Sequence, residues 1–176
     1  HFIRKYKVRI IAFLKILLIF FSSSSYSEVR IHCEGQETNL NTYLQIHKVL
    51  FSDRDTTRVE EFYSDKIISH NNDGGGPGSI ATPEKMRKMW ERSKKNNPER
   101  VLEDELILCV DDFVVVRTTI HSHDNTPLFG YPPTGKAYSI TATDIYRLEN
   151  GKVVERWGNS DLAHLFRQLG FKQVKE

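Results

Sequence analysis

The sequence predicts an α+β fold, with helices in the first half of the chain and an antiparallel sheet in the second. Apolar residues recur at helical spacing over residues 39–51, and a second marked helix is indicated over residues 82–96. From residue 101 onward, extended apolar segments alternate with short turns. Helices followed by a meander of strands are typical of an α+β domain. The sequence shows no internal repeat.

The helices in the first half differ in how clearly their starts are marked. Asn39 or Asn41 can cap the first helix, and a short helix is expected over residues 57–63. The clearest start is Thr82-Pro83-Glu84, which combines an N-cap hydroxyl, a proline in the first turn and an acid at the positive end of the dipole. Between these helices, residues 64–72 are expected to be irregular or briefly extended, and residues 73–79 to form a glycine-rich connection.

Four strands and a closing helix are predicted in the second half. Residues 101–110 and 113–123 are expected to be neighbouring strands, as are residues 137–148 and 152–159. Asn150-Gly151 joins the last two, and these residue types tolerate the positive φ angles of a type I′ hairpin turn. Leu162 to Leu169 suggests a short helix that ends at Gly170.

The first 27 residues resemble a secretory signal peptide. Four basic residues precede an apolar run from Ile10 to Phe21, which only Lys15 interrupts, and Ser25-Tyr26-Ser27 resembles a cleavage site. We therefore expect a secreted or periplasmic protein with a flexible mature N-terminus at 28–38, a single domain at 39–176 and no stable membrane span after cleavage. An uncleaved signal anchor is the alternative.

Composition argues against nucleic acid as a partner, but it does not decide whether the two cysteines form a disulfide. The 176-residue chain carries a net charge of +2 and is 39% hydrophobic, as a single soluble domain would be. Because four of its 25 basic residues fall in the first nine positions, no basic face indicates nucleic acid. Cys33 and Cys109 could pair in an oxidising compartment, although the apolar surroundings of Cys109 favour a buried thiol.

Several motifs in the chain resemble those of SnoaL-like polyketide cyclases, also called ester cyclases. These are Pro133-Thr-Gly-Lys136, the segment Asp144-Ile-Tyr-Arg-Leu-Glu-Asn-Gly-Lys-Val-Val-Glu-Arg-Trp157, then Asp161, and Arg167-Gln-Leu-Gly170. Upstream, Ser69-His70-Asn71 resembles the segment that holds a histidine in the first half of the family. The resemblance implies a nuclear-transport-factor-2-like fold, in which a curved, cone-shaped half-barrel of antiparallel strands is wrapped by N-terminal helices around a cavity.

The resemblance also implies catalytic residues. Asp161 matches an aspartate that cyclases of the family use as acid and base, but an aspartate before a helix is also a good N-cap. His70 matches a pocket histidine and could transfer a proton or bind a substrate carbonyl, with Asn71 beside it; a loop-capping role is the alternative. His121 matches a further position near the pocket.

Three more side chains are expected to bind substrate: Trp157 and Asn159, on the same strand face as Asp161, and Trp90 on the second helix. His121 and His123 share a strand face, but without a third ligand we predict no metal site. Arg147 is interpreted as the cross-strand partner of Glu155.

Two functions follow from these patterns. The first is a cofactor-independent cyclase, isomerase or hydrolase that acts on a small hydrophobic carbonyl compound by Asp/His acid–base chemistry. The second is a secreted, non-catalytic module that binds a hydrophobic ligand or a protein. From the resemblance we also expect a homodimer, in which two copies of the chain pair through their sheets.

Overall fold

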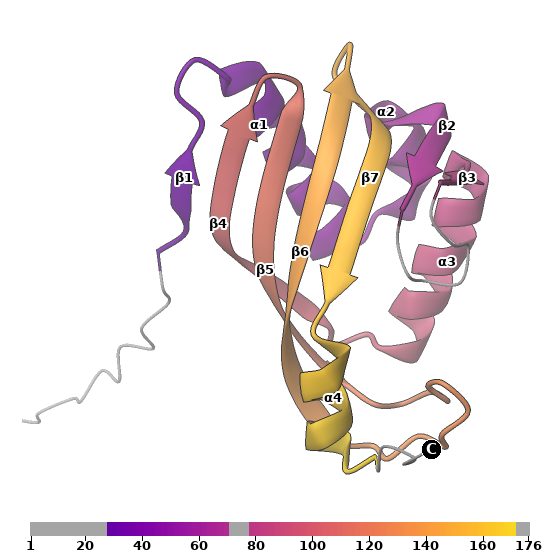
Figure 1. Ribbon diagram of the computed structural model, residues 1–176. Helices are drawn as coiled ribbons and strands as arrows, with labels where there is room; N and C mark the ends of the chain where they lie inside the picture. The colour runs from indigo at the N-terminus through magenta and orange to yellow at the C-terminus, as the bar shows by residue number, and fades with distance from the viewer. Residues whose placement is uncertain (1–27, 71–77, 172–176) are drawn as a thin grey trace, which may run out of the picture.

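The computed structural model describes residues 28–70 and 78–171, and a seven-stranded mixed sheet dominates it (Figure 1). The strand order is β1-β4-β5-β6-β7-β2-β3. The strands are β1 (Arg30–His32), β2 (Tyr63–Ser69), β3 (Ser79–Ala81), β4 (Val101–Val110), β5 (Phe113–His123), β6 (Ala137–Glu149) and β7 (Lys152–Ser160). The four long strands form the predicted antiparallel meander, whereas β1 joins β4, and β2 joins β7, in parallel.

In Figure 1, the helices α1 and α2 lie behind one face of the sheet, α3 lies at the right beside β2 and β3, and α4 lies below the lower end of the sheet. They are α1 (Glu37–Ile46), continued by the π-helix η1 (His47–Ser52), the 3-10 turn η2 (Thr56–Arg58), α2 (Val59–Phe62), α3 (Pro83–Asn96) and α4 (Leu162–Leu169). The α+β prediction, with a curved and unclosed sheet, is confirmed.

Local sequence signals account for several element boundaries. Asn150 and Gly151 have φ angles of 51° and 74°, as a type I′ turn requires. The Thr82 side chain accepts a hydrogen bond from the Lys85 backbone N–H at 3.3 Å, and Pro83 opens α3. Gly170 ends α4 in the left-handed region, with φ of 84°.

The first helix starts earlier than its expected caps. Gln36 precedes α1 without a side-chain capping bond, so Asn39 and Asn41 lie inside the helix. Asn39 instead donates to the Asp111 carbonyl at 2.9 Å, which connects α1 to the turn between β4 and β5. A long-range contact has therefore replaced the local cap that the sequence suggested.

The N-terminal segment is more ordered than expected. Residues 30–32 form β1 along the edge of β4, and Cys33 is bonded to Cys109 on β4. The preference for a buried thiol at Cys109 was therefore wrong, because β1 brings Cys33 within bonding distance. The bond joins two residues 76 positions apart in the sequence and fixes the edge strand to the sheet.

The main hydrophobic core lies between the helices and the inner face of the sheet. Ile46 of α1 and Val59 of α2 pack with Val114, Val116 and Val153, all of them at most 1% exposed. A second cluster packs α4, through Leu165 and Leu169, on Ile120 and Ile140. The two clusters fill the two ends of the inner face.

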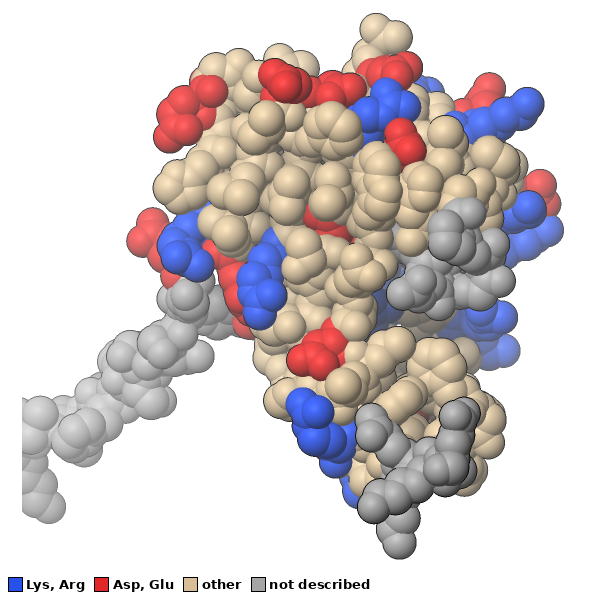
Figure 2. Space-filling model, in the orientation of Figure 1, with Lys and Arg blue, Asp and Glu red and all other residues tan. Residues whose placement is uncertain are grey.

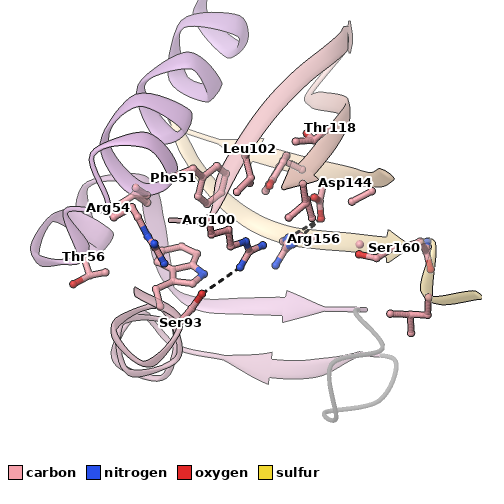
Figure 3. Close-up of a pocket in the computed structure, with 18 of the residues that line it drawn as sticks. Phe51, Arg54, Thr56, Ser93, Arg100, Leu102, Thr118, Asp144, Arg156 and Ser160 are labelled. Atoms are coloured by element: carbon pink, nitrogen blue, oxygen red, sulfur yellow. Dashed lines mark hydrogen bonds and ion pairs between the residues drawn. The ribbon is translucent and has the colours of Figure 1, made fainter. Parts of the chain in front are cut away.

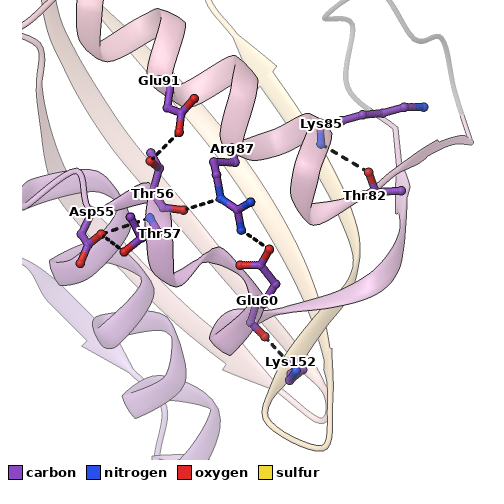
Figure 4. A network of polar contacts seen from close by, with 9 residues as sticks. All are labelled: Asp55, Thr56, Thr57, Glu60, Thr82, Lys85, Arg87, Glu91 and Lys152. Carbon is purple, nitrogen blue, oxygen red and sulfur yellow. Dashed lines mark hydrogen bonds and ion pairs between the residues drawn. The ribbon is translucent and has the colours of Figure 1, made fainter.

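A polar network positions α3 against the preceding turn and the distant hairpin (Figure 4). Arg87 of α3 donates to the Thr56 carbonyl at 3.2 Å and pairs with Glu60. Lys152, at the start of β7, donates to the Glu60 carbonyl at 2.8 Å. These bonds fix the helix that carries Trp90 and Ser93.

The predicted signal peptide, at 1–27, lies outside the described residues. Within the part of the chain that the structure describes, no helix is long and apolar enough to cross a membrane.

Candidate functional site

A cavity of about 320 Å³ opens between the helices and the inner face of the sheet (Figure 3). Its volume falls within the range typical of small-molecule sites. The residues that line it come from α1, η1, η2, α3, α4, the four long strands and the loops between these elements. They are Tyr43, Leu50, Phe51, Arg54, Thr56, Trp90, Ser93, Arg100, Leu102, Thr118, Ile120, Leu128, Phe129, Ala142, Asp144, Tyr146, Arg156, Gly158, Asn159, Ser160 and Leu162.

Aromatic rings form one wall of this cavity. Phe51 meets Trp90 edge to face, with the ring centroids 5.8 Å apart, and Trp90 meets Tyr63 in the same way at 5.7 Å. Such contacts hold large side chains in fixed orientations. Trp90 therefore occupies the position expected of a residue in the pocket wall.

An ion pair between Asp144 and Arg156 stands on the strand side of the cavity (Figure 3). Arg156 donates to Oδ1 of Asp144 through Nη2 at 2.7 Å and through Nε at 3.2 Å. Both bonds reach the same oxygen. Among the described residues, none forms a hydrogen bond with Oδ2, so this oxygen can accept a bond or a proton from a ligand.

Asp104 carries a second carboxylate beside the cavity, but protein groups occupy both of its oxygens. Tyr43 donates to Oδ2 at 2.9 Å, and Thr118 donates to Oδ1 at 2.8 Å. The Nε2 atom of His47 lies 3.6 Å from Oδ2. Asp104 therefore holds two lining residues, Tyr43 and Thr118, while Asp144 keeps an oxygen available.

Burial keeps the groups around Asp144 in fixed protonation states. Burial raises the pKa of Tyr146, and the charge of Asp144 raises it further, so the phenol stays protonated. Tyr43 shows the same direction, first from burial and then from Tyr146 and Asp104. Burial alone would lower the pKa of Arg156, but Asp144 and the neighbouring phenols raise it above its ordinary value.

Two β-bulges turn the charged side chains toward the interior. In β7, Leu148 pairs with Val153 but Arg147 pairs with Glu155, so Val154 is an extra residue and the strand changes face. Arg156 then points inward, beside Tyr146. In β4, the pairing slips between Asp104 and Leu106 and turns Asp104 inward in the same way.

The bulge in β7 also explains why the predicted site residues of that strand do not converge. A regular strand would place Trp157 and Asn159 on the same face as the buried Val153. Instead, Trp157 packs against Phe113 on the outer face, at a centroid distance of 6.1 Å. Asn159 is exposed, although it touches the rim of the cavity.

Asp161 is the N-cap of α4. Its side chain accepts a hydrogen bond from the His164 backbone N–H at 2.8 Å, and the residue is exposed. It is not among the described residues that line the cavity. The geometry thus matches the capping interpretation and does not place this carboxylate where the acid–base hypothesis needs it.

His70 lies on the outer face, at the end of β2. Its ring stacks on Trp157 with centroids 4.8 Å apart, and Nε2 lies 2.8 Å from Oε1 of Glu155. Arg147 donates to the other Glu155 oxygen at 2.9 Å, as the cross-strand prediction required. His70 and Trp157, each expected in the pocket, therefore lie together in a surface cluster away from the cavity. Asn71 lies outside the described residues.

His121 also faces away from the cavity. It alternates with the inward Thr118 and Ile120, and its Nε2 lies 3.4 Å from Glu103. His123 approaches Glu99 at 3.0 Å. Within residues 28–70 and 78–171, no cluster of three acidic, histidine or cysteine side chains could hold a metal ion.

No motif in the sequence gave Asp144, Arg156 or Arg100 a role in the site. One signal was available: Asp144 alternates with Ala142, Tyr146 and Leu148, so it is a charge on an otherwise apolar strand face. Arg156 could not be placed without knowledge of the bulge.

The helices, the bent sheet and the cavity between them define a nuclear-transport-factor-2-like protein. The chain belongs to the SnoaL-like polyketide cyclase family, whose sequence profile matches residues 41–169.

Solved structures share the fold. IdmH from Streptomyces antibioticus, a proposed polyketide cyclase, aligns over 75% of this chain and 98% of its own, at 22% identity and a TM-score of 0.64. A SnoaL-like protein from a Jannaschia species covers 78% of this chain and 94% of its own, at 17% identity and a TM-score of 0.66. AclR from Streptomyces galilaeus, a proposed hydroxylase, covers 80% and 89%, at 23% identity and a TM-score of 0.63. No curated protein sequence matches the chain.

Proposed function

We propose that this chain is a cyclase or isomerase that moves a proton on a small hydrophobic carbonyl compound, with Asp144 as the base. One observation carries the proposal. Oδ1 of Asp144 accepts both bonds from Arg156, which leaves Oδ2 without a bond to any described residue beside an aromatic wall. A carboxylate held this way is oriented by its partner and still free to react.

The proposed step uses only side chains of this chain. Oδ2 of Asp144 removes a proton from the carbon next to the substrate carbonyl, and the electron pair moves onto the carbonyl oxygen. The Tyr146 hydroxyl, which burial keeps protonated, supplies a hydrogen bond to that oxygen. Asp144 then returns the proton to carbon, or the enolate carbon attacks a second carbonyl and closes a ring, and the oxygen of that carbonyl takes the proton from Asp144.

Exchange of carbon-bound hydrogen in D₂O tests this step without knowledge of the natural substrate. The protein is incubated with 1-tetralone or 1-indanone, and loss of the signal of the proton beside the carbonyl is followed by NMR. We expect the wild type to accelerate exchange and Asp144→Asn to lose about 100-fold or more of that acceleration. Asp161→Asn should exchange like the wild type, because asparagine preserves the cap.

The opposite pattern would contradict the proposal. If Asp161→Asn abolished exchange while Asp144→Asn did not, the base would be Asp161, as the sequence motif suggested. If the wild type bound the ketones but never accelerated exchange, the chain would be a binding module.

We also propose that the protein works outside the cytoplasm. The Cys33–Cys109 disulfide supports this, because such bonds persist mainly in oxidising compartments. Mass spectrometry of protein from the medium or periplasm should find a mature N-terminus near Glu28; an intact leader on a cytosolic product would contradict it.

A homodimer through the sheet is the accompanying proposal about assembly. The face of the sheet opposite the helices is mostly uncharged (Figure 2). Light scattering should give twice the chain mass, and Val115→Arg, on that face, should reduce it; a wild-type monomer would contradict the proposal.

A further inference from the structure

The charges that line the cavity do not balance. Three arginines line it, Arg54, Arg100 and Arg156, but Asp144 is the only acidic residue among the described lining residues. Three positive charges against one negative leave a formal surplus of two. Arg156 and Asp144 neutralise each other, so the surplus belongs to Arg54 and Arg100.

Arg100 is the more exceptional of the two. Its Nη1 donates to the Ser93 hydroxyl at 3.2 Å, and its Nε is buried with no hydrogen-bond partner among the described residues. Within the described residues, no carboxylate lies within 4.0 Å of its guanidinium. Burial lowers the pKa of Arg100, and the charge of Arg156 adds to this effect. A largely buried guanidinium without an anion is costly, and an anionic ligand would remove this cost.

Arg54 adds a second charge on the same side. Its Nη1 donates to the carbonyls of Asn97 and Pro98, at 2.6 and 3.2 Å, and not to a carboxylate. Its backbone has a φ of 55°, a left-handed conformation that costs an arginine about 1 kcal/mol or more. Burial lowers its pKa, and repulsion from Arg100 lowers it further. The fold thus tolerates two neighbouring cations and a strained residue at one end of the cavity.

We propose that the ligand of this cavity is a small hydrophobic molecule that carries a carboxylate, and that Arg100 binds this carboxylate with the support of Arg54. The guanidinium of Arg100 points into the cavity toward that of Arg156 in Figure 3, with Ser93 behind it. A planar fork of donors matches the two oxygens of a carboxylate. The aromatic wall of Phe51 and Trp90 favours an organic acid over inorganic phosphate.

This inference deepens the proposed function, since it places the acid group at Arg100 and the reacting carbon toward Asp144. It names a substrate class, but its test needs no turnover. Binding of an anion and catalysis by Asp144 can therefore succeed or fail separately.

Isothermal titration calorimetry with 2-naphthoate and 2-naphthamide tests the inference, because the two probes have nearly the same shape and differ in charge. We expect the wild type to bind the acid at least ten-fold more tightly than the amide. Arg100→Gln should lose most of that preference, and Arg100→Lys should retain part of it. Arg92→Gln is the matched control, since Arg92 is an exposed arginine on α3 and should leave the preference intact.

Two further measurements separate binding from folding. Arg100→Gln should melt no lower than the wild type, because it removes a buried charge that lacks a carboxylate partner. Asp144→Asn should bind 2-naphthoate at least as tightly as the wild type, because Arg156 loses its competing anion. Equal affinity of the wild type for acid and amide, or an unchanged preference in a folded Arg100→Gln, would overturn the inference. If Asp144→Asn keeps the preference for the acid while no variant affects proton exchange, only the proposed catalysis fails.

Discussion

The Asp144–Arg156 pair makes a stability prediction that can be worked out from its geometry. Arg156→Met leaves the Asp144 carboxylate beside the cavity without its two donors. Loss of one member of a buried pair costs about 3 to 5 kcal/mol. The two side chains keep exposed fractions of 21% and 17%, so we expect the lower value, about 3 kcal/mol.

Substitution of the other member of the pair, Asp144, should cost less stability. Asp144→Asn keeps an oxygen that accepts from Arg156 but removes the charge, which should lower the free energy of unfolding by about 2 kcal/mol. In the double variant both substitutions remove the same interaction, so its loss is counted only once. We therefore expect its total loss to be about 2 kcal/mol smaller than the sum of the single losses.

Urea denaturation followed by circular dichroism measures all four free energies of unfolding. The exposed pair between Glu84 and Lys88, 2.7 Å apart, is the control, and its cycle should give no more than about 0.5 kcal/mol. Strictly additive losses at Asp144 and Arg156, or a coupling no larger than in this control, would refute the reasoning about the buried pair.

Three other features give predictions of their own. Asp161→Ala should lower the free energy of unfolding by about 1 kcal/mol and Asp161→Asn by only a few tenths, because asparagine also caps helices; equal losses in urea melts would contradict the cap. Replacing Cys33 and Cys109 with serine should cost about 2 to 4 kcal/mol, since the bond joins residues 76 positions apart; an unchanged melting curve would show that the bond adds nothing. Hydrogen bonds from His70 and then from Arg147 lower the pKa of Glu155 below its ordinary value of 4.5. Ionised Glu155 therefore stabilises the folded protein fully above pH 4.5, and this stabilisation is lost as the pH falls through the lowered pKa. The free energy of unfolding of Glu155→Gln should therefore fall less steeply at acid pH than that of the wild type. If the free energies of the two proteins fell in parallel as the pH was lowered, the prediction would be wrong.

The elements that the sequence predicted best are those set by local chemistry. Asn150 and Gly151 form their hairpin, Thr82 caps α3 and Gly170 ends α4, because each choice depends on neighbouring backbone atoms. The Arg147–Glu155 pair also formed across that hairpin. The motifs gave the family and the curved sheet, which no local signal specifies.

The site residues were harder to predict, because one extra residue in a strand changes the face that the following side chains occupy. Val154 interrupts the alternation of β7, so Arg156 enters the cavity while Trp157 turns outward. The slip beside Asp104 in β4 has the same effect. A motif match identifies residues in order, but it does not reveal a bulge between them. Asp161 matched the family position and nevertheless serves as a helix cap in this chain.

A crystal structure of the protein with 2-naphthoate would test most directly whether this cavity is the ligand site. The account predicts that the ring lies against Phe51 and Trp90, with the carboxylate within hydrogen-bond distance of Arg100. A probe bound on the outer face beside His70 and Trp157, with the cavity empty, would contradict it.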